Sequence, residues 1–384
     1  MGQPTFDNIA DSSLTRRRFM TLTSLAPVPT PNRTHLPSKI VSVGTAVPPD
    51  SYSQQDILDV YGITDERIRS VFRNSAIERR FLSLPPELPK GTRAVETQGE
   101  LLRKHKVTGI DMGKRAILSC LKDSDYELDD VGYLCCITTT GFLTPGFSAL
   151  LIKELGLSVT TSRLDVVGMG CNAGLNGLNA VAGWASAHPG RLALMVCVEA
   201  CSAAYVLDGT MRSSVVNSLF GDGAAAAALI TDEAGLEPGP TVLKFASCII
   251  PEAVDAMRYD WDDQQGKFSF FLDREVPYVV GAHAEDVIGR LLQDTGLRRS
   301  DIAHWVVHSG GKKVIDSVMV NLGLTRHALR HTTGVLRDYG NLSSGSFLFS
   351  YGRLLEEGVT RPGEYGVLMT MGPGSTIESA LLRF

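Results

Sequence analysis

The chain has 384 residues, of which 43% are hydrophobic and 21% are charged, and its net charge is −5. This is an ordinary globular composition, and the length is sufficient to bury one large core or two fused cores. No long run of Lys or Arg follows the first twenty residues, so the sequence lacks the basic stripe that nucleic-acid binding requires.

Seven cysteines are present, with no Cys-x-x-Cys pair, and most lie in apolar runs such as YLCCI at 133–137. This pattern indicates reduced, buried thiols in a cytoplasmic protein. It lacks the paired cysteines of a zinc finger, so we expect no metal site. No segment approaches the roughly 20 apolar residues of a membrane-spanning helix, so we expect no membrane partner.

The first 36 residues are expected to form a disordered tail. Within this tail, residues 15–20 have the sequence TRRRFM, which resembles a twin-arginine export motif. The run that follows is short and is interrupted by Pro27, Pro29 and Pro31. An export signal needs an unbroken apolar stretch, so we favour the disordered tail over an export signal.

Folded structure is expected to begin with a short β-branched strand at 39–44. Ser53 precedes an apolar segment in the manner of a helix cap. A basic helix is expected over 66–80 and a longer helix over 95–121, with a proline-rich loop at 85–89 between them.

Strands and helices then alternate to the end of the chain. We expect strands over 133–140, 162–167, 192–200, 224–231, 241–250, 304–309, 365–372 and 376–384. We expect helices over 172–187, 276–292, 312–322 and 344–357. Alternation of this kind predicts an α/β protein with parallel sheet covered on both faces. The rhythm repeats, which suggests two similar halves, 37–236 and 237–384.

The segment GMGCNAG at 168–174 is the most informative for chemistry, because it follows a strand and opens a helix. Helix N-termini favour a thiolate and can hold the oxyanion of a thioester under attack. We therefore nominate Cys171 as a nucleophile. Two alternatives stay open: a small buried cysteine, and a dinucleotide-binding turn based on Gly168 and Gly170. The acidic residue that such a turn needs about twenty positions later is missing.

Two polar residues further along the chain could assist Cys171. His308 ends an apolar strand before a glycine turn, and Asn341 lies in a turn before a helix. Taken singly, each residue is better explained as a satisfied core histidine or as a turn asparagine. Together, the three residues suit a cysteine nucleophile with two polar partners, although their spacing does not establish that they converge.

Five motifs occur in the order that the type III polyketide synthases of the thiolase superfamily show. They are DVVGMGCNAG (165–174), SLFGDGAAA (218–226), HSGG (308–311), YGNLSS (339–344) and MGPGSTIE (371–378). The resemblance runs from about residue 39 to the C-terminus. It implies a thiolase-like fold, in which duplicated βαβαβαββ halves form five αβαβα layers.

Longer segments resemble the bacterial 3,5-dihydroxyphenylacetyl-CoA synthases of glycopeptide-antibiotic pathways. They include CNAGLNGLNAVAGWASAHPG (171–190), DAMRYDWD (255–262) and RDYGNLSSGSF (337–347). This resemblance implies malonyl-CoA as starter and extender, and a tetraketide that closes to an aromatic ring and leaves as a CoA thioester. It also implies a cytoplasmic homodimer that needs no cofactor and is helped by proteins of the enoyl-CoA hydratase type.

The family resemblance also assigns roles to residues. Cys171 would carry the acyl group, His308 would help to ionise it, and His308 with Asn341 would stabilise the enolate that forms when malonyl thioester loses CO2. The implied pocket residues are Phe220 and Phe270 as gatekeepers, with Thr139, Cys201, Ala204, Ser343, Gly372, Pro373 and Gly374. The implied contacts for CoA are Arg67, Arg69, Arg73, Gly311, Lys312 and Lys313.

The sequence departs from the plant members of the family at the pocket. Asn172 replaces a phenylalanine, and Cys201 and Ala204 replace threonines, so starter and chain length do not follow from the family alone. Other classes of protein fit the sequence less well. A ketoacyl synthase III-type initiator shares the three residues but needs a basic surface for its carrier protein. A papain-like hydrolase would place its cysteine near the N-terminus, and a catalytically dead partner subunit would not need all three residues.

Overall fold

In a computed structural model, placement is described for residues 36–88, 93–122, 124–206, 208–232, 234 and 237–384. Residues 36–384 form one compact unit. The predicted tail and its twin-arginine segment lie outside the described residues, apart from Leu36. None of the helices among the described residues has the length and apolar character needed to cross a membrane.

The N-terminal half contributes five strands in the order β5-β4-β6-β7-β1. They are β1 (Lys39–Ala46), β4 (Val131–Thr138), β5 (Ser162–Val167), β6 (Leu192–Glu199) and β7 (Gly223–Ile230). Its three long helices are α3 (Gln98–Lys122), α4 (Phe147–Leu155) and α5 (Ala173–Ala187). Strands β4, β5 and β6 run parallel, whereas β7 is antiparallel to both of its neighbours. In chain order these elements give the predicted βαβαβαββ sequence.

The C-terminal half contributes four strands in the order β11-β12-β13-β8. They are β8 (Thr241–Ile249), β11 (Ile302–Val307), β12 (Tyr365–Gly372) and β13 (Thr376–Arg383). Its helices are α7 (Val276–Leu292), α8 (Lys312–Leu322), α9 (Arg330–Tyr339) and α10 (Ser346–Glu357). Only β11 and β12 are parallel here. A single residue pair, Lys39 with Thr241, joins the two halves into one nine-stranded sheet.

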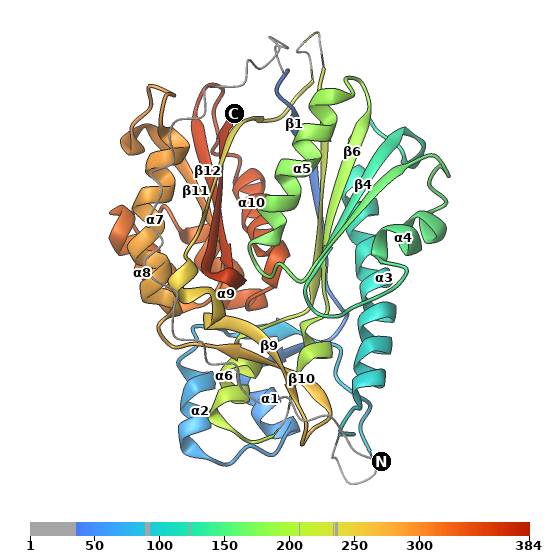
Figure 1. Cartoon of the computed structure of the whole chain (residues 1–384), viewed down its shortest axis with the longest axis vertical. Helices are drawn as coiled ribbons and strands as arrows, with labels where there is room; N and C mark the ends of the chain where they lie inside the picture. Colours follow the sequence, from blue (N-terminus) through green and yellow to red (C-terminus); the bar gives the residue numbers. More distant parts are fainter. Residues whose placement is uncertain (1–35, 89–92, 123, 207, 233, 235–236) are drawn as a thin grey trace, which may run out of the picture. The chain divides into compact units, whose positions relative to one another are not determined.

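Helices and sheet alternate in five layers across the molecule (Figure 1). Helices α3 and α4 cover one face of the N-terminal strands, and α7 and α8 cover the outer face of the C-terminal strands. Helices α5 and α10 lie between the two sets of strands and share a core with both. This is the predicted αβαβα layering. The expectation of parallel sheet is wrong in part, because antiparallel strands complete both halves.

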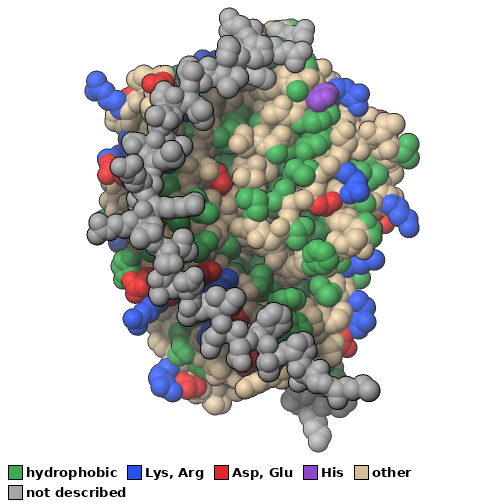
Figure 2. All heavy atoms as spheres, in the orientation of Figure 1, with side chains coloured by type: hydrophobic (Ala, Val, Ile, Leu, Met, Phe, Trp, Pro, Cys, Tyr) green, Lys and Arg blue, Asp and Glu red, His purple; other side chains and the backbone are tan. Residues whose placement is uncertain are grey.

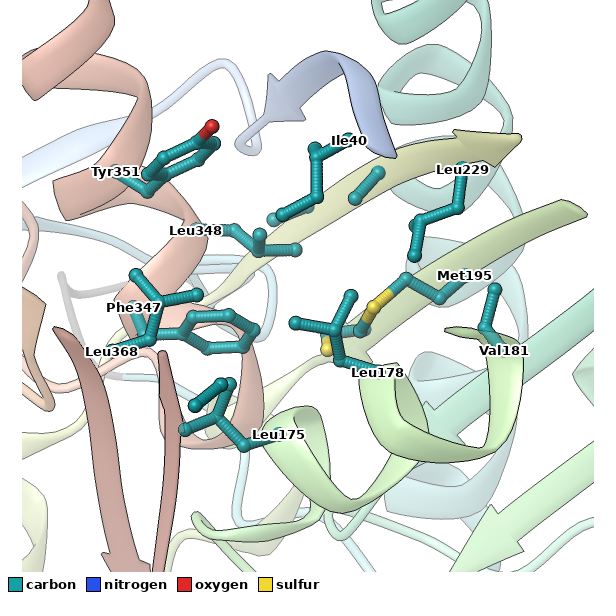
Figure 3. Close-up of a cluster of buried hydrophobic side chains, with 14 of the residues drawn as sticks. Ile40, Leu175, Leu178, Val181, Met195, Leu229, Phe347, Leu348, Tyr351 and Leu368 are labelled. Carbon is teal, nitrogen blue, oxygen red and sulfur yellow. The ribbon is translucent and has the colours of Figure 1, made fainter. Parts of the chain in front are cut away.

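The central layer brings α5 and α10 into close contact. Leu175 and Leu178 of α5 pack with Phe347 and Leu348 of α10 in one buried cluster (Figure 3). A Cβ atom on Gly174 would lie 2.2 Å from the carbonyl oxygen of Ser344. The glycine therefore allows the first turn of α5, which follows the nucleophile candidate, to lie directly against the chain that enters α10.

The remaining elements form a smaller group beside the sheets (Figure 1). They are β2 (Ser51–Ser53), α1 (Gln54–Val60), α2 (Glu66–Arg73), β3 (Arg79–Phe81), α6 (Met211–Leu219), β9 (Met257–Asp262) and β10 (Lys267–Leu272). Ser53 caps α1 through a capping box with Asp56, which confirms the predicted cap. The helix predicted over 66–80 is confirmed over residues 66–73, and its predicted extension to residue 80 is wrong. Asn74 ends α2, and Ala76 takes a left-handed φ of 60°, which a helix cannot continue through.

Removal of the Phe347 ring tests the central layer. Phe347 is fully buried between the two halves, and deleting such a ring leaves a cavity. We expect Phe347→Ala to lower the free energy of unfolding by about 3–5 kcal/mol in urea titrations. The control Val107→Ala, at a position that is 69% exposed on α3, should change it by less than about 0.5 kcal/mol. Equal effects of the two variants would contradict this packing.

Candidate active site

The nucleophile candidate lies on a sharp turn between β5 and α5. Gly168 and Gly170 have φ values of 82° and 86°, in the left-handed region that favours glycine. A Cβ atom on Gly170 would lie 2.0 Å from Cδ of Pro373, so the β12–β13 loop closes over the turn. Cys171 is only 8% exposed. The turn therefore places the Cys171 side chain inside the protein rather than in bulk solvent.

Two cavities meet at Cys171. One has a volume of about 320 Å³ and the other about 450 Å³. Four residues line both cavities: Cys171, Phe220, Met257 and Phe270. The rings of Phe220 and Phe270 stand edge to face with centroids 5.9 Å apart. The sulfur therefore lies at a neck between two chambers, and two phenylalanine rings border that neck.

His308 lines the larger cavity, together with Cys171 and Asn341. It follows the end of β11, and its backbone N–H donates to the Met369 carbonyl over 2.8 Å. Its side chain is buried, and Nδ1 has no hydrogen-bond partner among the described residues. Burial lowers the pKa of His308 to about 3, so the ring is neutral at pH 7 and can both donate and accept a proton.

Asn341 is held in place by its own backbone and by its neighbours. Its N–H donates to the Leu219 carbonyl over 2.8 Å, and its carbonyl accepts from Gly221 N–H over 3.0 Å. Its side-chain Oδ1 accepts from Ser343 N–H over 2.8 Å, and Nδ2 approaches the Gly310 carbonyl at 3.3 Å. Asn341 lines the same cavity as His308, and its Nδ2 carries a second hydrogen beyond the one donated to Gly310.

The Cys171 thiol donates to Ser343 Oγ over 3.5 Å. Burial raises the pKa of this thiol to about 12, outweighing the hydrogen bond with Ser343, which lowers it, and the charge of Glu199 raises it further. The sequence predicted a thiolate from the position at a helix N-terminus. In this structure burial dominates over the helix end. Burial thus favours the uncharged form of both the thiol and the imidazole.

Glu199, which the sequence analysis missed, is linked to the thiol through hydroxyl groups. Its fully buried carboxylate accepts from Thr139 and Ser344, each through both backbone N–H and hydroxyl. Thr139 Oγ1 lies 2.9 Å from Ser343 Oγ, which in turn accepts from the thiol. The one sequence signal was a carboxylate at the end of the apolar strand LALMVCVE, the kind of position that His308 occupies after its own strand.

The structure brings together most of the predicted pocket. Seven of the predicted side chains line the smaller cavity: Thr139, Cys201, Ala204, Phe220, Phe270, Ser343 and Pro373. Gly372 and Gly374 line neither cavity. Gly372 instead packs against the nucleophile turn, where a Cβ atom would lie 2.8 Å from the Cys171 backbone nitrogen. Resemblance did not predict Tyr205, Met257 and Tyr259, which complete this wall.

The predicted CoA contacts divide into two groups. Gly311, Lys312 and Lys313 line the larger cavity, as does Arg274, which was not predicted. Arg67, Arg69 and Arg73 line neither cavity. They pair instead with acidic residues at the start of their own helix, Arg67 with Asp65 and the other two with Glu66. The face of α2 that lines the cavity carries Ser70, Val71 and Asn74.

Metal chemistry has no candidate residues in the described parts of the chain. Within them, no group of three or more His, Cys, Asp or Glu side chains is arranged to hold a metal ion. The arrangement that remains is a cysteine, a neutral histidine and an amide around one cavity. The cysteine lies at the start of a central helix in a fold of five αβαβα layers. This fold and this set of residues together define a thiolase-like condensing enzyme.

Comparison with known proteins specifies the family. The chain matches the N-terminal domain of chalcone and stilbene synthases over residues 29–233 and the C-terminal domain over 244–384. It is 68% identical to the 3,5-dihydroxyphenylacetyl-CoA synthase of Streptomyces toyocaensis, covering 93% of this chain and 92% of that protein. It is 68% identical to the enzyme of the same name from Amycolatopsis balhimycina, covering 90% and 93%.

A solved structure agrees in fold. The PKS-I of the brown alga Ectocarpus siliculosus superposes with a TM-score of 0.84 at 24% identity, covering 92% of this chain and 100% of that one. The chain therefore belongs to the chalcone and stilbene synthase family, the type III polyketide synthases. The predicted family and thiolase-like fold are confirmed, and the protein is an acyltransferase of that family.

The reactivity of Cys171 with iodoacetamide tests the electrostatics of the site. Since the thiol pKa is raised to about 12, the thiolate fraction should increase roughly tenfold per pH unit between about pH 7 and pH 9, and alkylation with it. Removing the Glu199 charge should lower this pKa, so Glu199→Gln should speed alkylation at a fixed pH. Glu154→Gln, on the exposed face of α4, is the control. Rates are followed by peptide mass spectrometry, and a rate that does not change below pH 7 would instead indicate a preformed thiolate–imidazolium pair.

Proposed function

We propose that this enzyme condenses malonyl-CoA units and closes a tetraketide to 3,5-dihydroxyphenylacetyl-CoA, the precursor of dihydroxyphenylglycine in antibiotic biosynthesis. Identity of 68% with synthases of that name, over nearly the whole chain, is the observation that carries the proposal. The position of Cys171 at the neck of two cavities supports it. One cavity can hold the CoA arm while the other holds the growing chain.

Loading of the acyl group needs a base for the thiol proton. The neutral His308 can accept that proton as the Cys171 sulfur attacks the thioester carbonyl, and can then protonate the departing CoA thiolate. Thioester exchange conserves the energy of the acyl bond, so the step needs no cofactor. We infer that the ion pair exists only during transfer, because both groups are neutral beforehand.

Decarboxylation of a bound malonyl thioester develops negative charge on the thioester oxygen. His308 and the Nδ2 amide of Asn341 line the cavity that would hold this thioester. Two neutral donors aimed at one oxygen in a dry site can lower a barrier by several kcal/mol. The enolate that forms when CO2 leaves then attacks the acyl group on Cys171, and the lengthened chain returns to that sulfur.

The CoA phosphates are proposed to lie against the wall opposite α2. Three cations line the larger cavity: Lys313, Arg274, which is paired with Glu275, and Lys312, which is paired with Asp316. The three α2 arginines that the resemblance implied line neither cavity. Charge for the phosphates is therefore available from the β10–α7 connection and from the first turn of α8.

A homodimer is proposed as the assembly. Strand β5 ends the nine-stranded sheet and is largely exposed, so it offers unpaired backbone groups to a second copy. Figure 2 shows hydrophobic side chains along the middle of the face that carries α5 and this edge. A cytoplasmic location and help from proteins of the enoyl-CoA hydratase type stay predictions from the resemblance.

The direct test is incubation of the purified protein with malonyl-CoA alone. We expect CoA release and a product with the mass of 3,5-dihydroxyphenylacetyl-CoA or its acid, and we expect Cys171→Ala to abolish it. Cys248→Ala, at a half-exposed cysteine outside both cavities, should retain it. Turnover that begins only when another acyl-CoA is added would overturn the malonyl-only starter while keeping the condensing enzyme.

Asn341→Asp tests the decarboxylation step. A carboxylate in place of the amide would face the developing enolate charge and would also meet the Gly310 carbonyl. We expect CO2 release from malonyl-CoA to fall by about 100-fold or more, measured with carboxyl-labelled substrate. Normal CO2 release by a folded variant would rule out a role for this amide.

Variants of the cavity mouth test the phosphate contacts. Arg274→Ala combined with Lys313→Ala should raise the KM for malonyl-CoA about tenfold, the equivalent of roughly 1.4 kcal/mol. The KM for malonyl N-acetylcysteamine, which has no phosphates, should not change. Arg67→Ala combined with Arg73→Ala is the matched control and should have little effect. If the Arg67/Arg73 variant raised the KM for malonyl-CoA and the Arg274/Lys313 variant did not, the phosphates would bind at α2 instead.

A further inference from the structure

A buried arginine stands behind the neck between the two cavities. Arg80, on β3, is fully buried yet lines neither cavity. Its Nη1 lies 2.8 Å from the Phe220 carbonyl, 2.6 Å from the Asn217 carbonyl and 2.8 Å from the Tyr205 hydroxyl. The Tyr205 hydroxyl also donates to the Phe220 carbonyl. Two residues that border the smaller cavity, Phe220 and Tyr205, are therefore tied to one guanidinium.

The other side of the guanidinium is anchored to α1. Nη2 donates to Gln54 Oε1 over 2.7 Å. Gln54 in turn donates to Ser75 Oγ over 2.7 Å and to the Ser218 carbonyl over 2.8 Å. Burial lowers the pKa of Arg80, and the nearby Tyr205 and Asp222 oppose that shift. Burying a charge whose direct hydrogen-bond partners are neutral is costly, so this arrangement needs a reason beyond filling space.

The chain that Arg80 holds also carries Asn341. Leu219 and Gly221 flank Phe220, and both exchange backbone hydrogen bonds with Asn341. A Cβ atom on Gly340 would lie 2.8 Å from Arg80 Cδ and 2.6 Å from the Leu219 carbonyl. Position 340 therefore has no room for a side chain between Arg80 and residues 219–221. A shift of the guanidinium would move Phe220 and Asn341 together.

We propose that Arg80 is a positioning residue, which couples the phenylalanine gate at the neck to the amide that faces the malonyl thioester. It acts through the Phe220 carbonyl and the paired backbone of residues 219–221 and 341. This inference rests on the proposed function. Arg80 would keep the neck through which the growing chain passes correctly placed relative to the site of decarboxylation. The two guanidinium nitrogens of Arg80 bind groups on opposite sides, the Phe220 carbonyl through Nη1 and Gln54 Oε1 through Nη2. A lysine has a single ammonium group and cannot hold both of these partners in the same geometry.

Arg80→Lys tests the inference by two readings. In the crystal structure of the variant, the Phe220 ring should be displaced relative to the wild type. In turnover with malonyl-CoA, CO2 release should fall about tenfold or more, and the share of aromatic product should drop in favour of shorter lactones. The KM should change less than about twofold, because Arg80 lines neither cavity. A merely structural role would lower the yield of folded enzyme without changing the share of products.

Arg330→Lys is the matched control, since this partly buried arginine pairs with Glu357 away from both cavities. It should keep the product share of the wild type. A folded Arg80→Lys enzyme with Phe220 unmoved and products unchanged overturns the proposal. If Arg80→Lys does not fold, Gln54→Met replaces it, because this variant removes the hydrogen-bond partner of Nη2. The position of the Phe220 ring and the share of products are then measured in the same way. If the wild type makes no aromatic product, the proposed function fails, and the position of Phe220 still decides the role of Arg80.

Discussion

The close approach of α5 to the chain entering α10 is the constraint on which the site depends. Gly174 admits the Ser344 carbonyl at a distance that any side chain would prevent. The nucleophile turn, from the N-terminal half, is thereby brought against residues 341–344 of the C-terminal half. The β12–β13 loop closes the turn from the other side through Pro373. Neither half has a complete site without the other.

Burial governs the electrostatics that follow from this packing. The same enclosure that raises the pKa of the Cys171 thiol lowers the pKa of His308. Burial therefore favours the uncharged form of both groups. The hydroxyl chain from the thiol through Ser343 and Thr139 ends on the Glu199 carboxylate. This chain of hydrogen bonds connects the thiol to a buried carboxylate, whose charge raises the pKa of the thiol.

Local pattern predicted the strands of the large sheet and several of its helices, but it missed helices α4, α6 and α9. The boundaries of β5, α7, α8 and β12 follow the sequence analysis residue for residue. The β9–β10 hairpin was missed, since the aromatic residues of β9 alternate with charges and both strands are partly exposed. The face of α2 that lines the larger cavity was also missed, because Asp65 and Glu66 pair with Arg67, Arg69 and Arg73, which line neither cavity. Convergence of Cys171, His308 and Asn341 came from resemblance alone, and the contributions of Glu199 and Arg80 depend on contacts distant in sequence.

Mass spectrometry of the enzyme quenched during turnover with carbon-13 malonyl-CoA would test the central claim most directly. The account predicts acyl adducts of increasing ketide length on the peptide that contains Cys171, and none on peptides that contain Cys201 or the other cysteines. Labelled product that forms while Cys171 remains unmodified, or an adduct on Cys201 that turns over at the rate of product formation, would contradict the assignment of Cys171 as the residue that carries the chain.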